Sequence, residues 1–158
     1  MIFATVGSTQ IPFERFVRAL EALPGEQLAV QHGPVGPPAG AARANAFMQF
    51  PELIESIEAA DAVVCHAGAG SILCALRAGH IPVVVPRLKR YGETVDDHQV
   101  EFSRALAAEG KVIAVEDLDR LCAAVEAAPA RCSAAERKGS LPIQAAVRQA
   151  LHAAPALA

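Results

Sequence analysis

Short apolar runs occur at intervals along the chain, separated by segments in which apolar residues recur every three or four positions. The runs are apolar throughout rather than alternating between apolar and polar, which is typical of strands covered on both faces. The strands predicted in this way are Ile2–Val6, Leu28–Gln31, about Ala46–Gln49, Asp61–Cys65, Val83–Val85 and Lys111–Val115.

The intervening segments predict helices. Helical spacing is clear in the first of them, where Pro12 suits the first helical position and Pro24-Gly25 ends the helix. Its apolar positions are Phe13, Phe16, Val17, Leu20 and Leu23. Four more helices are predicted: one opened by Pro51, one over Ser71–Ala78, one from Asp96/Asp97 to about Glu109, and one from about Asp117.

Strands and helices alternate through most of the chain, which predicts an α/β fold. Parallel strands with helices on both sides form a doubly wound, Rossmann-like sheet, here of about six strands. We expect residues 1–128 to form one such domain, with residues 129–158 as a separate tail. Ligands of these sheets bind beyond the carboxyl ends of the strands, so functional residues are expected in the loops there.

Composition and charge exclude several classes. The formal net charge of −3 gives no general electrostatic reason to bind nucleic acid or anionic lipid. No apolar run approaches the roughly 20 residues of a membrane span, and the N-terminus lacks the basic region of a signal peptide. The cysteines show no CxxC spacing, so zinc is not expected. We expect buried free thiols in a reducing cytoplasm instead. They are Cys65, Cys74, Cys122 and Cys132.

The tail differs from the rest of the chain in charge. Residues 129–158 carry a formal charge of +3, which leaves −6 on residues 1–128. A final helix is predicted by the apolar stripe Ile143, Val147, Ala150 and Leu151. Such a stripe packs on its own domain or docks against another chain, and the sequence leaves both interpretations open.

Three predicted carboxyl-end loops carry unusual residues: Gly7-Ser8-Thr9, residues 66–71, and residues 87–99. The second is a strand-to-helix turn in which Gly68 and Gly70 would bring bare backbone N–H groups close to a ligand. A helix N-terminus carries unpaired N–H donors and partial positive charge, which suits phosphate.

Other groups at the same edge would assist phosphate binding. Ser71 adds a hydroxyl or caps the helix, and Gly7-Ser8-Thr9 supplies a second set of donors. His66 would donate to a phosphate oxygen; the alternative is a histidine packed at a strand end. For Cys65 and Cys74 core packing is the favoured interpretation.

The glycine pattern does not fit two common nucleotide sites. Gly68-x-Gly70 lacks the third glycine of a dinucleotide fingerprint, and no acidic residue follows Val83–Val85 to hold a ribose. No GxxxxGK[ST] motif occurs either. An NAD-binding oxidoreductase domain is therefore disfavoured.

Read as a whole, the stretch ADAVVCHAGAGSILCALRAGHIPVVVPR (residues 60–87) followed by GETVDDHQVE (residues 92–101) resembles the donor-binding half of family 28 glycosyltransferases of the GT-B fold. TVGSTQIPFERFV (residues 5–17) resembles their first strand, loop and helix. The resemblance covers about residues 1–118. It is closest to the small subunits of split, two-chain enzymes, both the bacterial exopolysaccharide, glucuronosyltransferase-like group and the eukaryotic UDP-GlcNAc transferase.

The resemblance implies a role for each motif. A UDP-sugar would lie across the carboxyl edge, with its diphosphate at Gly68, Ala69, Gly70 and Ser71 and the first loop, and with His66 as the catalytic residue. Gln99 and the adjacent His98 match the position that binds the donor sugar. Arg87 and Glu93 match the loop near sugar and phosphate, and their alternative interpretation is a solvated loop. For His98 and Gln99 the alternative is an exposed first turn of a helix.

The nucleoside end of the site is less well defined. Many such domains have an acidic residue that binds the ribose where this chain has Cys74, and a thiol is a poor replacement for a carboxylate. Because the bacterial group tolerates a non-acidic residue there, this departure favours that group. Met48 and Phe50 lie where a uracil pocket is expected, with sheet core as the alternative.

The resemblance also implies a division of labour. A complete transferase needs an acceptor-binding domain, for which this chain has no room, so we expect it to be inactive alone. The expected partner is a membrane-associated subunit that binds a lipid-linked sugar acceptor and recruits this cytoplasmic chain to the inner membrane face. No metal, cofactor or nucleic acid is expected. The sequence leaves open whether the isolated chain forms a homo-oligomer, which an uncovered docking surface would favour. The alternative is a non-catalytic accessory module that stabilises or positions the partner.

Overall fold

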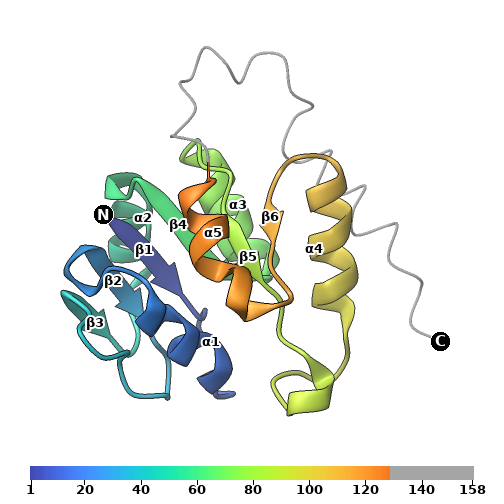
Figure 1. Ribbon diagram of the computed structural model, residues 1–158, viewed down its shortest axis with the longest axis horizontal. Coiled ribbons are helices and arrows are strands. Elements are labelled where there is room, and N and C mark those ends of the chain that lie inside the picture. The colour runs from blue at the N-terminus through green and yellow to red at the C-terminus, as the bar shows by residue number, and fades with distance from the viewer. Residues whose placement is uncertain (129–158) are drawn as a thin grey trace.

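Six parallel strands form one sheet in the order β3-β2-β1-β4-β5-β6 in the computed structural model, which describes residues 1–128 (Figure 1). The strands are β1 (Ile2–Thr5), β2 (Leu28–Gln31), β3 (Arg43–Asn45), β4 (Ala62–His66), β5 (Val83–Val85) and β6 (Ile113–Ala114). The α-helices of this part of the chain are α1 (Glu14–Ala19), α2 (Phe50–Ala59), α3 (Ala69–Arg77), α4 (His98–Ala108) and α5 (Leu121–Glu126). The predicted α/β class and parallel sheet are confirmed.

Helices cover both faces of the sheet, and neighbouring residues of each central strand serve opposite faces. On one face α1 and α5 pack against Ala4 and Val64, through Phe16 and Leu121 among others. On the other face α2, α3 and α4 pack against Phe3, Val63, Cys65 and Val84, through side chains that include Ile57, Ile72 and Leu106. Burial on both faces explains why the runs that predicted these strands are apolar throughout.

The third strand was predicted at the wrong place. β3 spans Arg43–Asn45 and pairs with β2, whereas the apolar signal lies over residues 46–49. β3 is an edge strand with mostly exposed side chains, so it has no reason to be apolar on either face. The apolar residues that suggested a strand instead lie in the segment before α2, and one of them, Phe47, is 40% exposed.

Several element boundaries also differ from the prediction, and those of β4 and α3 bear on the site. α1 begins at Glu14, after Phe13, rather than at Pro12. The last strand is shorter than predicted, and α5 follows a 3₁₀ turn over Leu118–Arg120. β4 includes His66, and α3 begins at Ala69 rather than at Ser71. The turn between strand and helix is therefore only residues 67–68.

Some sequence predictions fall outside the described residues. These are the tail helix with its apolar stripe, and Cys132. Within residues 1–128 no helix is long and apolar enough to cross a membrane. In the same range Cys65 is buried, Cys74 and Cys122 are half-buried, and all three are free thiols. No group of three or more His, Cys, Asp or Glu side chains there is placed to hold a metal ion.

Candidate functional site

The three predicted loops meet at the carboxyl edge of the sheet. β1, β4 and β5 are adjacent and parallel, so the segments that follow them emerge side by side (Figure 1). The Arg87 Nη2 atom, beyond the end of β5, donates to the carbonyl oxygen of Val6, beyond the end of β1, at 3.2 Å. The expected gathering of these loops is therefore present.

The His66 ring lies against two glycines. A Cβ atom added at Gly7 would lie 2.4 Å from His66 Cε1, and one added at Gly68 would lie 2.1 Å from His66 Nε2. Real Cβ atoms do not approach other heavy atoms so closely, and Gly7 also has a φ of +84°, which side chains other than glycine rarely adopt. The sequence suggested only that Gly68 lets a ligand approach the backbone. In the structure a glycine is also needed at this position to make room for the imidazole.

No contact within the described residues requires a glycine at position 70. A Cβ atom added there meets nothing within 4 Å, and its φ lies outside the left-handed region. It stands exposed in the first turn of α3, where glycine is worse for helix stability than alanine. Open space in front of bare backbone is what a closely approaching ligand needs.

The first turn of α3 leaves its backbone donors uncapped. Gly68 is the N-cap residue and no side chain caps this end of the helix. The N–H groups of Ala69, Gly70 and Ser71 therefore lack intrahelical partners. Ala69 and Gly70 are exposed and Ser71 is half-buried, so these donors and the positive end of the helix dipole face the carboxyl edge.

His66 is neutral at physiological pH. The pKa of its imidazole is lowered from 6.5 to about 4, mainly by burial and also by the positive charge of Arg87, while the backbone of Thr5 acts in the opposite direction. The His66 Nδ1 atom is buried without a hydrogen-bond partner among residues 1–128. A neutral ring that lacks a full set of partners retains the capacity to bind and to take up a proton when an anion approaches.

The turn after β1 is held by two buried polar side chains that the sequence analysis did not single out. The Gly7 N–H donates to Thr5 Oγ1 at 3.1 Å, and Gln31 Nε2 donates to the Gly7 carbonyl oxygen at 3.3 Å. The Gly7 N–H thus points inward, although Gly7-Ser8-Thr9 was predicted to donate to phosphate. Ser8 is exposed, and Thr9 Oγ1 accepts from the N–H of Ile11 at 3.2 Å.

Arg87 and Glu93 are buried, only 2% and 5% exposed, so the alternative interpretation of a solvated loop is wrong for both. Besides Val6, the Arg87 guanidinium donates to the carbonyl oxygens of Ile11, Pro12 and Glu93 at 3.0–3.2 Å. It also lies 4.5 Å from the centre of the Phe13 ring. Burial lowers the pKa of this guanidinium and Glu93 raises it again. Arg87 therefore ties the loop after β1 to the loop after β5.

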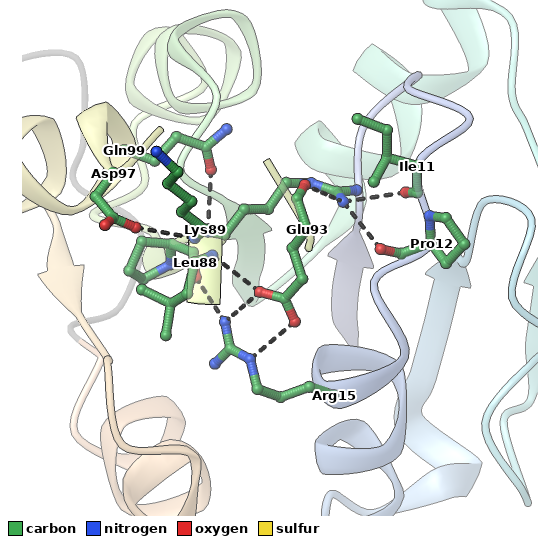
Figure 2. A network of polar contacts seen from close by, with 10 residues as sticks. Ile11, Pro12, Arg15, Leu88, Lys89, Glu93, Asp97 and Gln99 are labelled. Carbon is green, nitrogen blue, oxygen red and sulfur yellow. Dashed lines mark hydrogen bonds and ion pairs between the residues drawn. The ribbon is translucent and has the colours of Figure 1, made fainter. Parts of the chain in front are cut away.

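Arg15 completes this cluster and was missed from sequence. Figure 2 shows its guanidinium gripping the Glu93 carboxylate through two hydrogen bonds of 3.0 and 2.8 Å. It also donates to the Pro86 carbonyl oxygen at 2.8 Å and lies over the Tyr91 ring at 5.3 Å. No local sequence motif predicts this contact, because Arg15 and Glu93 are 78 positions apart in the chain.

The two predicted sugar-binding residues of α4 differ in placement. Gln99 is 9% exposed, and its Oε1 accepts from the Arg87 backbone N–H at 3.1 Å (Figure 2). Gln99 Nε2 has no protein partner in the described range, so one end of the amide is held and the other is available. His98 is exposed and its ring contacts the Asp96 carboxylate, whose pKa is lowered by that contact. The exposed-turn interpretation fits His98 and is wrong for Gln99.

The residues suggested for the nucleoside lie together on the α2 and α3 side of the sheet. Met48 and Cys74 are half-buried against one hydrophobic cluster, whereas Phe50 is 65% exposed at the start of α2, which argues against sheet core for it. Burial raises the pKa of the Cys74 thiol. A neutral thiol is a weak hydrogen-bond acceptor, so Cys74 does not supply what a carboxylate would.

Comparison with known proteins gives a consistent result. The family model described as "Glycosyltransferase family 28 C-terminal domain" matches residues 1–151. A protein named "UDP-N-acetylglucosamine transferase subunit ALG13" from Yarrowia lipolytica is 28% identical over 135 residues, which cover 75% of this chain and 66% of that protein. A protein of the same name from Cryptococcus neoformans is 49% identical over 63 residues, which cover 37% of this chain and 30% of that protein. The chain thus spans under two thirds of each of these relatives.

Proposed function

Because the chain belongs to the glycosyltransferase family 28 C-terminal domain family, we propose that it is the donor-binding, catalytic subunit of an inverting UDP-sugar transferase. The observation that carries this proposal is the first turn of α3: three uncapped N–H groups, with Gly70 leaving open space in front of them. The donor diphosphate lies across this turn. Ser8 and Thr9 extend the site from the neighbouring loop.

Transfer depends on stabilising the leaving group. The bond between the anomeric carbon and the phosphate oxygen breaks, UDP leaves with that electron pair, and the acceptor oxygen attacks the same carbon from the opposite face. The acceptor proton passes to a base supplied by the partner subunit. Fixed donors at the end of α3 act most strongly on the charge that develops on UDP, so no divalent metal is required.

His66 contributes to the same charge stabilisation. Its imidazole is neutral in the free protein because burial lowers its pKa to about 4. A neutral ring lies beside a dianionic ligand without the cost of burying a charge beforehand. As charge grows on the departing phosphate oxygen, an N–H of the ring strengthens its hydrogen bond to it.

The donor sugar is bound at the start of α4. The free amide end of Gln99 suits a sugar hydroxyl, with exposed His98 beside it. Arg87 and Glu93 act on this subsite by holding the loop that carries it, since both Nη atoms of Arg87 and both carboxylate oxygens of Glu93 are hydrogen-bonded within the protein. The identity of the sugar follows from product analysis.

The setting of the reaction is a two-chain enzyme at a membrane. Relatives bear names of a UDP-N-acetylglucosamine transferase subunit, which supports a partner chain and a UDP-sugar donor for this chain too. We assign it to bacterial polysaccharide synthesis with a lipid-linked acceptor, where a membrane-associated partner recruits it from the cytoplasm to the inner face. Alone, it transfers no sugar.

A second candidate function is a non-catalytic accessory module. The observation in its favour is Cys74, a neutral thiol at the usual acidic ribose position, whose pKa burial raises further. His66→Ala in the complex with the partner separates the two functions. Loss of transfer with an intact complex supports the enzyme, and unchanged transfer supports the module.

The direct test is a thermal-shift titration of the purified chain in EDTA with UDP, UDP-GlcNAc, UDP-glucuronate, UDP-glucose and NAD. A ligand that binds only the folded state raises the melting temperature. We expect stabilisation by the uridine compounds and none by NAD. Stabilisation by NAD alone, or by no uridine compound with either the chain or its complex, would contradict the proposal.

A further inference from the structure

Thr5 and Gln31 are buried polar residues at the carboxyl ends of two apolar strands. They stand opposite each other in the register of β1 and β2, and they are 1% and 4% exposed. Burying a hydroxyl and a carboxamide costs free energy unless their hydrogen bonds are made. Replacing both partners of such a pair by apolar groups is often neutral for stability, so stability alone does not account for them.

Their hydrogen bonds form a closed circuit with Gly7. The Gly7 N–H donates to Thr5 Oγ1 at 3.1 Å, Thr5 Oγ1 donates to Gln31 Oε1 at 2.9 Å, and Gln31 Nε2 donates to the Gly7 carbonyl oxygen at 3.3 Å. Both backbone polar groups of Gly7 are thereby held by side chains. The circuit fixes the direction in which the chain leaves β1.

The fixed turn lies against the imidazole of His66. The position that a Cβ atom of Gly7 would occupy lies 2.4 Å from His66 Cε1 and 2.7 Å from Nε2, so the Gly7 backbone forms one wall of the ring's site. Gly68 forms another, with the corresponding position 2.1 Å from Nε2. The first wall depends on the circuit, whereas the second is set by the turn into α3.

We propose that Gln31, acting with Thr5, is a positioning residue for His66: the circuit holds Gly7 against the imidazole and so sets the ring relative to the uncapped donors of α3. Its consequence for donor binding rests on the proposed function. Its effect on the ring does not, because it concerns contacts within the free chain.

The test compares four variants of the full chain by NMR titration of the His66 ring. Thr5→Val removes the hydroxyl at constant shape, Thr5→Ser keeps it, and Gln31→Met removes the carboxamide. Ser103→Ala is the matched control, because it deletes another buried hydroxyl, which donates to the Val100 carbonyl oxygen at 3.0 Å. The charged group that acts on His66 in this region is Arg87, which all four variants retain.

We expect Thr5→Val and Gln31→Met to loosen the wall at Gly7 and admit water, so the pKa of His66 rises from about 4 toward 6.5. Thr5→Ser and Ser103→Ala should leave it where it is in the parent chain. If both circuit-breaking variants fold and the ring titrates as before, the proposal is wrong. It is equally wrong if Ser103→Ala moves the ring as far as Thr5→Val does.

A second readout extends the test to the donor. We expect UDP to bind Thr5→Val and Gln31→Met about tenfold more weakly, the lower end of the effect seen when a partner that orients a metal-binding histidine is removed. Failure of the parent chain to bind UDP would count against the proposed function alone, since the ring titration still decides the positioning role. If both variants bind UDP as tightly as the parent chain although the pKa of His66 has shifted, the circuit affects the ring only in the free protein. Its proposed role in donor binding would then be wrong.

Discussion

The turn after β4 and the loop after β5 lie side by side at one edge of the sheet and use their polar groups in opposite ways. The turn presents backbone N–H groups from a helix end that no side chain caps, around a glycine with open space in front of it. The loop contains the charged residues Arg87 and Glu93, and it turns them inward. Small residues of the turn therefore face the solvent, while Arg87 and Glu93 hold the structure; Lys89 and Arg90 of the same loop are exposed.

In the proposed site, backbone N–H groups rather than Arg87 or Arg15 would bind the anion. Arg87 and Arg15 donate to five carbonyl oxygens and to one carboxylate, so most of their N–H groups are used within the fold. The loops are thereby fixed at the right distance from one another. Donors that are already oriented then require little reorganisation when a ligand arrives.

The largest effect is expected from Arg87→Met, which tests whether the loop after β5 is structural. It leaves the carbonyl oxygens of Val6, Ile11, Pro12 and Glu93 without a donor. We expect a loss of about 3–5 kcal/mol in the free energy of unfolding, measured by urea denaturation with circular dichroism. Arg87→Lys is the control: it keeps a charge for a phosphate but loses the planar fork, so it should lose most of the same stability. Parental stability with lost UDP binding would instead place Arg87 in the ligand site.

Gly68→Ala tests the wall of the His66 site. The added methyl collides with the imidazole, so we expect about 1–3 kcal/mol of destabilisation. In a His66→Ala background the ring is absent, and the same change should cost little, which a double-mutant cycle measures. Gly36→Ala, where an added Cβ meets nothing, is the matched glycine control. Equal costs of Gly68→Ala in both backgrounds would mean that the ring does not need this glycine.

Gly70→Ala tests the open side of the same turn. Since the methyl meets nothing in the free protein, stability should stay the same or rise by up to about 1 kcal/mol from better helix propensity. We expect UDP affinity to fall about tenfold, equivalent to about 1.4 kcal/mol, because the methyl stands between the ligand and the donors. Calorimetric titration checks this, and an unchanged affinity would remove Gly70 from the site.

A further test is the pH dependence of stability that comes from His66. Its pKa is about 4 in the folded chain and 6.5 in its ordinary state, so the unfolded chain binds the extra proton between these values. Stability from this group is therefore complete above pH 6.5 and is lost as the pH falls toward 4. We expect His66→Gln to flatten that part of the curve in urea denaturations run from pH 7 to pH 4. An unaltered slope would show that His66 has the same pKa in the folded and the unfolded chain.

Most of the fold was predictable because the central strands are buried on both faces and parallel strands need helical connections. β3 was not, since an edge strand carries no apolar signature. His66 stood out as a polar residue ending an apolar strand, and Thr5 and Gln31 share that signal. The roles of Thr5 and Gln31 depend on the register between two strands, which pairs residues 26 positions apart. The role of Arg15 depends on a contact with a residue 78 positions away. Local sequence patterns do not contain such pairings.

The most direct test of the account is a UDP titration followed through the backbone amide signals of the ¹⁵N-labelled chain. We expect the largest changes at Ala69, Gly70 and Ser71, smaller ones at Ser8 and Thr9, and little change over residues 88–93. Changes centred on residues 88–93, with the start of α3 unaffected, would contradict it. The diphosphate would then lie at the loop that the account treats as structural.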